Sequence, residues 1–565
     1  MHTKRLSFYN LLYLHVFCYK NTPITKGNST KRISQHNNMK KNFFRAVALS
    51  ALLAMGVNGA QAQSRTYDCP PLNPEYQALA EQVVSLNMED PDKANKVYMN
   101  LSKKIKKSKE DLVAVGTYFL EHDNYPAASM CAKDVYTLDP TYVPGLMFYG
   151  EVYMKAQRWG EAGGRFDEVL AIDPTNIAAM KRNAFVYKNV NPHAAIDYLN
   201  KIKEADPSFT DADKEKGDIY YKLSDYAKAI ESYNSYYAAT PKEEGKIDIA
   251  ACENYLQSLF SMSVKDETYL DKIIAITQEI QPLAPKDIII PRMAFFAKYN
   301  KVETSMDYDG ALKAADDAAA YIRDKQFADS VYMYLDYDFA AKLAKEQGNL
   351  ADAINYYELA VKDLETKAAD LDDEKKKAEN ATKRGSYYYE ISNLYVRNKQ
   401  AAKGIEVFNK YLELLGDKAD LSDKYQLGYK YAAAYQQKDN TPEQKKEYHD
   451  KAISTFKAIT EAQSENRMPI LMSYRMLANL SITDANKPSA TACEYYTKLM
   501  NESEGEDVKE KAKNLRFEAC RYLFFYYVSI DTPNKAEATK YATIAKEINP
   551  DNDFVKAAFE HLKTM

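Results

Sequence analysis

The chain has 565 residues, which is too long for one compact core, so several domains or an open array of repeats are expected. Its 46% hydrophobic and 28% charged residues argue against a disordered chain and against a bundle of membrane-spanning helices. Glycine (18) and proline (20) are scarce while tyrosine (47) is abundant, which predicts long helices joined by short turns.

Residues 1–62 are predicted to carry no part of the fold. From Met39 the sequence MKKNFFRAVALSALLAMGVNGAQAQS has a basic start, an apolar run of about a dozen residues and a small-x-small AQA site. This pattern predicts a secretory signal peptide over 39–62 that is cut after Ala62. A buried first helix or a membrane anchor is the alternative, but the apolar run is short of the roughly 20 residues that a span needs. Residues 1–38 then form an upstream extension, predicted to be disordered.

Removal of residues 1–62 changes the charge of the chain. The segment holds nine of the 76 basic residues and none of the 80 acidic ones, so the mature chain carries a formal charge of −13. An acidic surface repels phosphate groups, so nucleic acid is not expected as a partner, and neither are dense anionic lipid surfaces.

Five cysteines remain after the predicted cleavage. They form no C-x-x-C pair, which argues against a zinc site or a thioredoxin-like motif. Cys493 and Cys520 fall in neighbouring predicted helices and could pair in an oxidising compartment, although two small buried thiols are the simpler expectation. Because no cysteine lies at the cleavage site, we predict export to the periplasm without a lipid anchor. Peripheral association with the outer membrane is compatible with this prediction.

Four prolines lie at nearly constant spacing. Pro140, Pro174, Pro207 and Pro241 follow one another at almost equal intervals, and they end the similar tripeptides LDP, IDP, ADP and ATP. Proline cannot continue a helix and biases the preceding residue away from helical angles, so each marks the end of a helix and a turn. The period of about 34 residues indicates a repeat array.

Between these prolines the apolar residues recur every three or four positions, which predicts two amphipathic helices in each unit. In the unit 143–176, Tyr149 belongs to the apolar stripe of the first helix and Phe166 to that of the second. Gly150 and Ala162 fall where the two antiparallel helices would come closest, because only a very small side chain allows that approach.

The pattern resembles the tetratricopeptide repeat, in which positions 4, 7, 11 and 24 are bulky, 8 and 20 are small, and 32 is proline. SDYAKAIESY (224–233) and GNLADAINYYELAV (348–361) match its second-helix core closely, with Ala229 and Ala353 at the small position.

The resemblance implies an all-α fold, a right-handed α-α superhelix (solenoid) of about eleven helix-turn-helix repeats. Looser copies extend almost to the C-terminus, where DNDFVKAAFEHLKTM is expected to form a capping helix. The three prolines of QPLAPKDIIIP interrupt the helical register, so we expect an N-terminal array over 63–285 and a C-terminal array over 286–565.

The sequence offers no recognisable catalytic motif. The mature chain has four histidines, far apart and in no H-E-x-x-H arrangement, and it lacks phosphate-binding glycine loops, a dinucleotide fingerprint and a G-x-S-x-G elbow. We therefore predict no cofactor, no metal site and no enzymatic activity. An enzyme would instead require a deep pocket with coupled ionisable groups.

The tyrosine-rich segments VYMYLDYDF (331–339) and GSYYYEISNLY (385–395) have two interpretations. Exposed rings would form a platform for stacking sugars or peptides. Tyr337, Tyr388 and Tyr395, however, fall at bulky core positions of a repeat, so most rings are expected to pack and a minority to face the groove.

In the family, the first helix of each repeat lines the inner surface and contributes positions 2, 5, 9, 12 and 13. Carried onto this sequence, the resemblance implies a partner-binding set, here called the inner row: Thr117, Glu121, Glu151, Lys155, Phe185, Lys188, Asp218 and Tyr221. Its mixture of both charges with two aromatic rings suits peptides or proteins better than nucleic acid. The carboxylate clamp that grips chaperone C-termini in this family is not supported, because Lys181 fits but Phe185 stands where the clamp needs asparagine.

The expected function is a non-enzymatic protein–protein interaction scaffold of the bacterial cell envelope that binds one or more envelope proteins or peptides. A role in envelope or outer-membrane assembly comes from resemblance to bacterial envelope repeat proteins. Neither a transmembrane span nor a small-molecule ligand is expected. The alternative is a glycan-binding or nutrient-capture module that uses exposed tyrosines near Asp, Asn or Arg side chains.

Overall fold

The computed structural model describes residues 67–87, 89–105, 107–324 and 332–565, so the predicted extension and signal peptide lie outside the described residues. All regular secondary structure in these ranges is helical. The contacts divide the chain between residues 327 and 328 into an N-terminal unit (α3 to α16) and a C-terminal unit (α17 to α28). The boundary expected between residues 285 and 286 falls inside the N-terminal unit instead, because α15 packs on α13 and α14.

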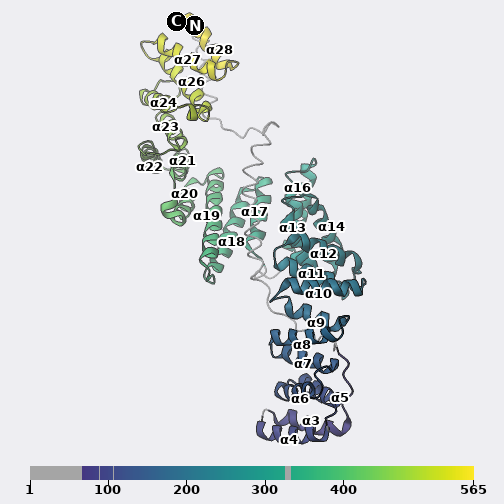
Figure 1. The fold of residues 1–565 in the computed structure, drawn as a ribbon. Coiled ribbons are helices and arrows are strands. Elements are labelled where there is room, and N and C mark those ends of the chain that lie inside the picture. Colours follow the sequence, from purple (N-terminus) through teal and green to yellow (C-terminus); the bar gives the residue numbers. More distant parts are fainter. Residues whose placement is uncertain (1–66, 88, 106, 325–331) are drawn as a thin grey trace. The chain divides into compact units, whose positions relative to one another are not determined.

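The N-terminal unit contains seven helix pairs among its described residues (Figure 1). In chain order they are α3 (Pro74–Leu86) with α4 (Pro91–Ile105), α5 (Lys109–Glu121) with α6 (Tyr125–Leu138), α7 (Val143–Lys155) with α8 (Trp159–Ile172), α9 (Ile177–Tyr187) with α10 (Pro192–Ala205), α11 (Asp211–Lys222) with α12 (Tyr226–Ala239), α13 (Ile249–Met262) with α14 (Thr268–Ile280), and α15 (Ile289–Asn300) with α16 (Tyr308–Asp324). A short 3-10 turn, η2 (Gln281–Leu283), follows α14.

The described residues of the C-terminal unit form five further pairs and a last helix. The pairs are α17 (Tyr334–Glu346) with α18 (Leu350–Ala368), α19 (Glu374–Arg397) with α20 (Ala401–Leu415), α21 (Leu421–Tyr435) with α22 (Pro442–Thr460), α23 (Met468–Leu480) with α24 (Ala490–Glu502), and α26 (Lys513–Ser529) with α27 (Lys535–Ile548). The short elements η4 (Gly416–Lys418) and α25 (Glu506–Lys509) lie between pairs, and α28 (Asp553–Thr564) ends the chain.

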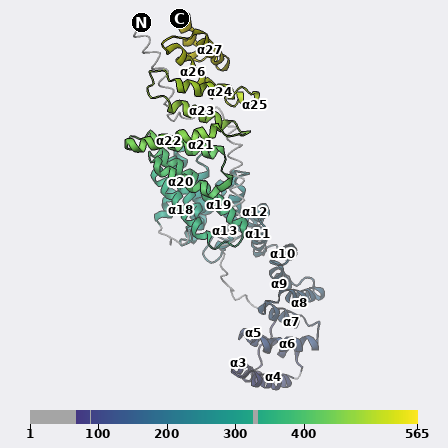
Figure 2. The same cartoon turned by 90° about the vertical axis from the view of Figure 1, so that its left-hand side faces the viewer.

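Each helix packs on its partner. First helices of neighbouring pairs also touch: α5 contacts α7, and α11 contacts α13. Figures 1 and 2 show the helices α5 to α12 following one another in chain order through the N-terminal unit. This stacking of helical hairpins confirms the predicted all-α solenoid within each unit. No helix in the described part of the chain combines the length and hydrophobicity that crossing a membrane requires.

Glycines on the first helices allow aromatic rings on the second helices to approach. A Cβ atom added at Gly150 in α7 would lie 2.3 Å from a ring carbon of Phe166 in α8, and one at Gly217 in α11 would lie 2.6 Å from Tyr233 in α12. Both distances are far inside van der Waals contact, so only glycine fits. Gly150 therefore lies at a tight contact within its pair, and Ala162, the other small residue of the expected closest approach, is fully buried.

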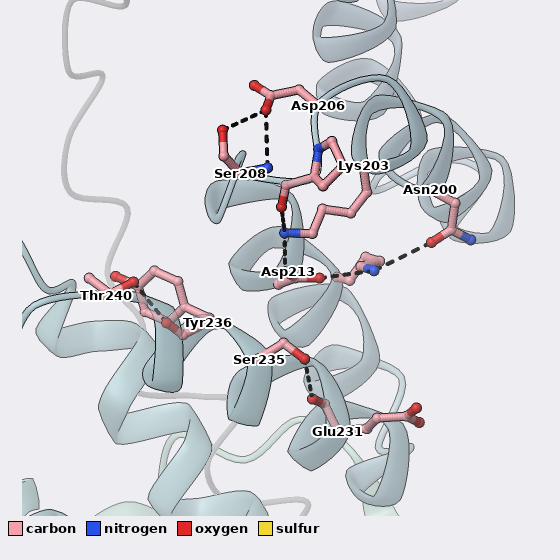
Figure 3. A network of polar contacts seen from close by, with 11 residues as sticks. Asn200, Lys203, Asp206, Ser208, Asp213, Glu231, Ser235, Tyr236 and Thr240 are labelled. Atoms are coloured by element: carbon pink, nitrogen blue, oxygen red, sulfur yellow. Dashed lines mark hydrogen bonds and ion pairs between the residues drawn. The ribbon is translucent and has the colours of Figure 1, made fainter.

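The repeated Asp-Pro turns are fixed by the aspartate. Asp139 and Asp173 each accept hydrogen bonds from the backbone N–H and the hydroxyl of the threonine two residues later, and Asp206 does the same with Ser208. The turn between α10 and α11 is also held by Lys203, which donates to the carbonyl of Pro207 at 2.7 Å and pairs at 2.9 Å with the buried Asp213 (Figure 3). The recurring aspartates are therefore structural.

Tyrosine hydroxyls donate to carboxylates on a neighbouring helix at many places in both units. The O···O distances run from 2.5 to 3.1 Å in the pairs Tyr98 to Asp134, Tyr187 and Tyr198 to Asp167, Tyr233 to Asp218, Tyr237 to Glu279, Tyr388 to Glu365, Tyr395 to Glu358, and Tyr411 to Asp423. Bonds to a charged acceptor are stronger than neutral ones, so these pairs tie adjacent helices together. Most of the abundant tyrosine therefore serves packing. Tyr388 is buried, as expected of a core position, whereas Tyr337 and Tyr395 are half-buried.

The last helix closes the array. Phe554 of α28 packs edge-on against Phe517 and Phe524 of α26, with ring centroids 6.1 and 5.6 Å apart, and Leu562 is buried. This contact covers the apolar face that α26 and α27 would otherwise expose, which is the task of a capping helix.

Cys493 and Cys520 are buried free thiols in the structure. Their sulfur atoms face different neighbours, the Tyr527 hydroxyl and the Met500 sulfur. The alternative of a disulfide between them is not realised.

The close fit at Gly150 can be tested by adding one methyl group. The Gly150→Ala variant gains about 0.8–1.0 kcal/mol of helix propensity but loses about 1–3 kcal/mol to overpacking against Phe166. Gly164→Ala in α8 makes the same change where no atom lies within 4 Å, so it should raise the melting temperature. Thermal unfolding followed by circular dichroism should rank Gly150→Ala below Gly164→Ala, and equal stability of the two variants would contradict the contact.

The tyrosine–carboxylate bonds predict cooperative unfolding in alkali. Burial, reinforced by Asp167 and Glu358, raises the pKa of Tyr187 and Tyr395 to about 12. Between pH 10 and 12 the unfolded chain loses these protons while the folded chain keeps them, so rising pH favours unfolding. Tyrosine absorbance at 295 nm should therefore rise in one step together with the loss of helical ellipticity at 222 nm. Gradual titration near pH 10 with the helices intact would argue against this account.

Candidate protein-binding surface

The inner row lies on the first helices of four successive pairs in the N-terminal unit. Thr117 and Glu121 are on α5, Glu151 and Lys155 on α7, Phe185 on α9 with Lys188 directly after it, and Asp218 and Tyr221 on α11. The structure does not gather them into one cluster but distributes them over several small groups.

Thr117 is covered by the chain itself. It is only 3% exposed, and its hydroxyl lies 2.9 Å from the hydroxyl of Tyr67 in the segment before α3. The Tyr67 ring also packs near Phe148 of α7, with centroids 6.3 Å apart. The inner surface of α5 and α7 is therefore already occupied at this point.

The charged members of the row on α5 and α7 differ in exposure. Glu121 is exposed at the end of α5. Glu151 forms an ion pair with Arg182 of α9, and both side chains are largely buried, so this pair fastens α7 to α9. Lys155 is exposed and pairs at 2.6 Å with Asp123 in the turn after α5. Exposed pairs of this kind contribute little to stability, so Lys155 is available to a partner.

A partly exposed aromatic patch lies at the turn ends of α8 and α9. Trp159, the single tryptophan of the chain, is 37% exposed and meets the Phe185 ring edge-on at 6.1 Å. The Lys188 ammonium sits 4.3 Å from the centre of the same ring. Val190, two residues further on, is 70% exposed. We call Trp159, Phe185 and Lys188 the aromatic patch.

The α11 members of the row are bonded to neighbouring helices. Asp218 accepts hydrogen bonds from Tyr233 at 2.6 Å and from the Asn254 amide of α13 at 3.2 Å, and burial raises the pKa of its carboxyl. The Tyr221 hydroxyl donates to Gln257 of α13 at 2.9 Å. Asp218 is therefore largely a structural residue, while Tyr221 remains partly exposed.

A pair of acids extends this polar region onto the next helices. Burial, together with a hydrogen bond to Asp287 at the start of α15, raises the pKa of Glu253 in α13 to about 8. Burial and the neighbouring carboxyl of Asp287 both disfavour the charged form of Glu253.

Several residues of this surface are absent from the predicted row. Trp159 begins a second helix, outside the family's binding positions, and only its status as the single tryptophan could have drawn attention to it. Glu253 and Gln257 lie in a repeat that is too degenerate for its positions to be numbered from the sequence. Tyr67 precedes the first repeat, so no repeat pattern could have placed it.

The hollows found on the described residues lie away from the inner row. One of about 460 Å³ in the C-terminal unit is lined by Tyr435, His449 and Leu480, among others, and one of about 410 Å³ in the N-terminal unit is lined by Pro282 and Tyr321, among others. Within the described ranges no three His, Cys, Asp or Glu side chains are placed to hold a metal ion.

Residues 187–244, from the end of α9 to just beyond α12, match the family model described as tetratricopeptide repeat. Among curated proteins, Hsp70-Hsp90 organizing protein 3 of Arabidopsis thaliana is 30% identical over 112 residues, which are 20% of this chain and 20% of that protein. The chain thus spans about a fifth of the length of the curated relative that it matches.

Three solved structures are similar over part of the chain. The MamA protein is 19% identical, with 32% of this chain and 94% of MamA covered and a TM-score of 0.28. A tetratricopeptide repeat protein from Parabacteroides merdae is 14% identical (46% and 93% covered, TM-score 0.28), and pilF of Pseudomonas aeruginosa is 15% identical (39% and 96% covered, TM-score 0.28). No functional inference follows from similarity at this level. Residues 187–244 thus match a tetratricopeptide repeat, and the helical hairpins of the described residues on either side are stacked as the resemblance implied.

Proposed function

We propose that the chain is a non-enzymatic scaffold of the bacterial cell envelope that binds partner proteins through the inner row and the adjoining aromatic patch. Tetratricopeptide repeats are interaction modules, and the helical hairpins here present an extended surface that suits another chain. The sequence pattern at 39–62 supports export to the periplasm, and the absence of a cysteine at the predicted cleavage site supports an unlipidated protein.

The observation that carries the proposal is the aromatic patch. Trp159 is 37% exposed and Phe185 is half-buried, so both large rings keep surface that a partner can cover. Aromatic side chains are the commonest anchors of protein interfaces, and the Lys188 ammonium over the Phe185 ring adds a polar rim. A peptide or protein surface with an apolar anchor and nearby acids fits this combination.

The environment of the tyrosines favours a protein partner over a glycan. A glycan site needs exposed rings with free polar groups beside them, whereas many tyrosine hydroxyls here donate to carboxylates of the same chain. Of the described tyrosines, Tyr308 and Tyr429 keep large exposed fractions, and they lie in different units. The acidic charge of the mature chain disfavours nucleic acid.

The proposal predicts that the aromatic patch and Tyr221 are required for partner capture. Intact cells expressing an affinity-tagged copy are crosslinked, and the proteins that co-purify are quantified by mass spectrometry. Because interface anchors commonly contribute about 2 kcal/mol or more, the double variant Phe185→Ala, Tyr221→Ala should recover at least about tenfold less of specific envelope proteins.

A matched control removes exposed aliphatic side chains from second helices. Leu138 ends α6 and Ile172 ends α8, and both are exposed, so the double variant Leu138→Ala, Ile172→Ala should capture the same partners as the wild type. Melting curves check that both double variants fold. If no protein is enriched above background, the scaffold is wrong, and binding on a glycan array would support the alternative.

A further inference from the structure

A non-helical segment of the chain lies across the inner surface of the first repeats. Residues 67–72, here called the strap, directly precede Asn73, the N-cap of α3. Tyr67, Cys69 and Leu72 pack against the buried cluster formed by α3 to α7, and Tyr67 also packs against the next cluster, formed by α7 to α9. One ring therefore bridges two cores.

The hydrogen bond at Thr117 has a defined direction. The Thr117 hydroxyl donates its proton to the carbonyl of Val113 at 2.7 Å, one turn back in α5. The Thr117 oxygen is therefore an acceptor toward Tyr67, and the Tyr67 hydroxyl is the donor at 2.9 Å. The site thus receives an aromatic ring that carries a hydrogen-bond donor at its tip.

The prolines of the strap favour an extended backbone. Proline fixes its own φ angle and biases the residue before it toward extended angles, so Cys69-Pro70-Pro71 and Asn73-Pro74 are held extended. Asp68 and Pro71 are exposed, whereas Tyr67, Cys69 and Leu72 are half-buried. A stiff extended segment loses little entropy when it lies in a groove.

We propose that the surface of α5 and α7 beneath Tyr67 is a binding site for extended segments with a tyrosine-like side chain, and that the strap is its built-in, displaceable occupant. A partner segment of the same chemistry takes the place of Tyr67 on Thr117 and Phe148. The inference deepens the proposed function by naming the chemistry of one partner segment and an internal competitor for it.

The contacts of the strap support displacement. Tyr67 is only half-buried, and a net hydrogen bond contributes about 0.5–1.5 kcal/mol. None of residues 67–72 is fully buried, and segments without fully buried side chains are among the first to open locally. The strap is nevertheless tethered beside its site, so a free peptide must compete with a high effective concentration.

The test uses a fluorescein-labelled peptide of sequence YDCPPLN, which is residues 67–73, under reducing conditions. Wild-type protein should bind the peptide weakly because this surface is occupied. The Tyr67→Ala variant should bind it at least about tenfold more tightly in fluorescence anisotropy, because the competent state becomes the dominant one. A peptide with alanine in place of its tyrosine should lose this gain.

Two further variants separate the ring from its hydroxyl. Tyr67→Phe keeps the ring and should bind the peptide with an affinity between those of the wild type and Tyr67→Ala. If Tyr67→Ala does not fold, Tyr67→Phe tests the proposal in its place. Thr117→Val combined with Tyr67→Ala removes the acceptor at nearly constant volume and should weaken peptide binding. If the folded Tyr67→Ala protein binds the peptide no better than the wild type, the strap is a permanent structural element and the proposal is wrong.

The maleimide reactivity of Cys69 reports independently on whether the strap opens. It is half-buried, whereas the other described cysteines are buried. Maleimide labelling located by mass spectrometry should modify Cys69 several-fold faster in Tyr67→Ala than in the wild type, and an unchanged rate would count against an opening strap. These experiments do not involve Phe185 or Tyr221, so their failure would leave the partner-capture experiment to decide the proposed function separately.

Discussion

The close approach of the two helices within each pair is the constraint on which the rest of the structure depends. Gly150 faces Phe166, Gly217 faces Tyr233 and Gly428 faces Phe456, so the same contact recurs in both units. An aromatic ring of one helix fills the space that the glycine of the other helix leaves open. This fit sets the separation of the two helices. Pairs that share this contact stack one after another, and several of their first helices touch, as α5 and α7 do.

Hydrogen bonds from tyrosine hydroxyls to Asp and Glu carboxylates also join neighbouring helices. Asp167 alone accepts hydrogen bonds from Asn183, Tyr187 and Tyr198, on two different helices. A buried phenol needs a partner, and an ionised carboxylate is a strong one. The high tyrosine content and part of the acidic charge are thus explained by packing rather than by ligands, which reduces the number of polar groups that the array can offer to a partner.

The binding surface is consequently small and divided. At its start the surface holds the chain's own Tyr67, in the middle the aromatic patch is partly exposed, and toward α13 and α15 the surface becomes a network of amides and acids. Such a division allows different parts of one extended partner to be recognised by different chemistry, an aromatic side chain in one place and a polar one in another. It also makes the first part of the surface accessible only when the strap leaves.

The sequence by itself determined the helical hairpins, their period and the role of residues such as Gly150 and the Asp-Pro turns, because helix periodicity and turn chemistry are local properties. The resemblance implied which helices line the inner surface. The three-dimensional contacts show which residues of the inner row the chain itself covers. Thr117 is covered by Tyr67, which is 50 residues away in the chain. Glu151 forms an ion pair with Arg182 of the next repeat. Trp159 packs against Phe185, which lies on a different helix. These contacts link residues of different repeats or lie outside the repeat pattern, so residue spacing along the chain does not predict them.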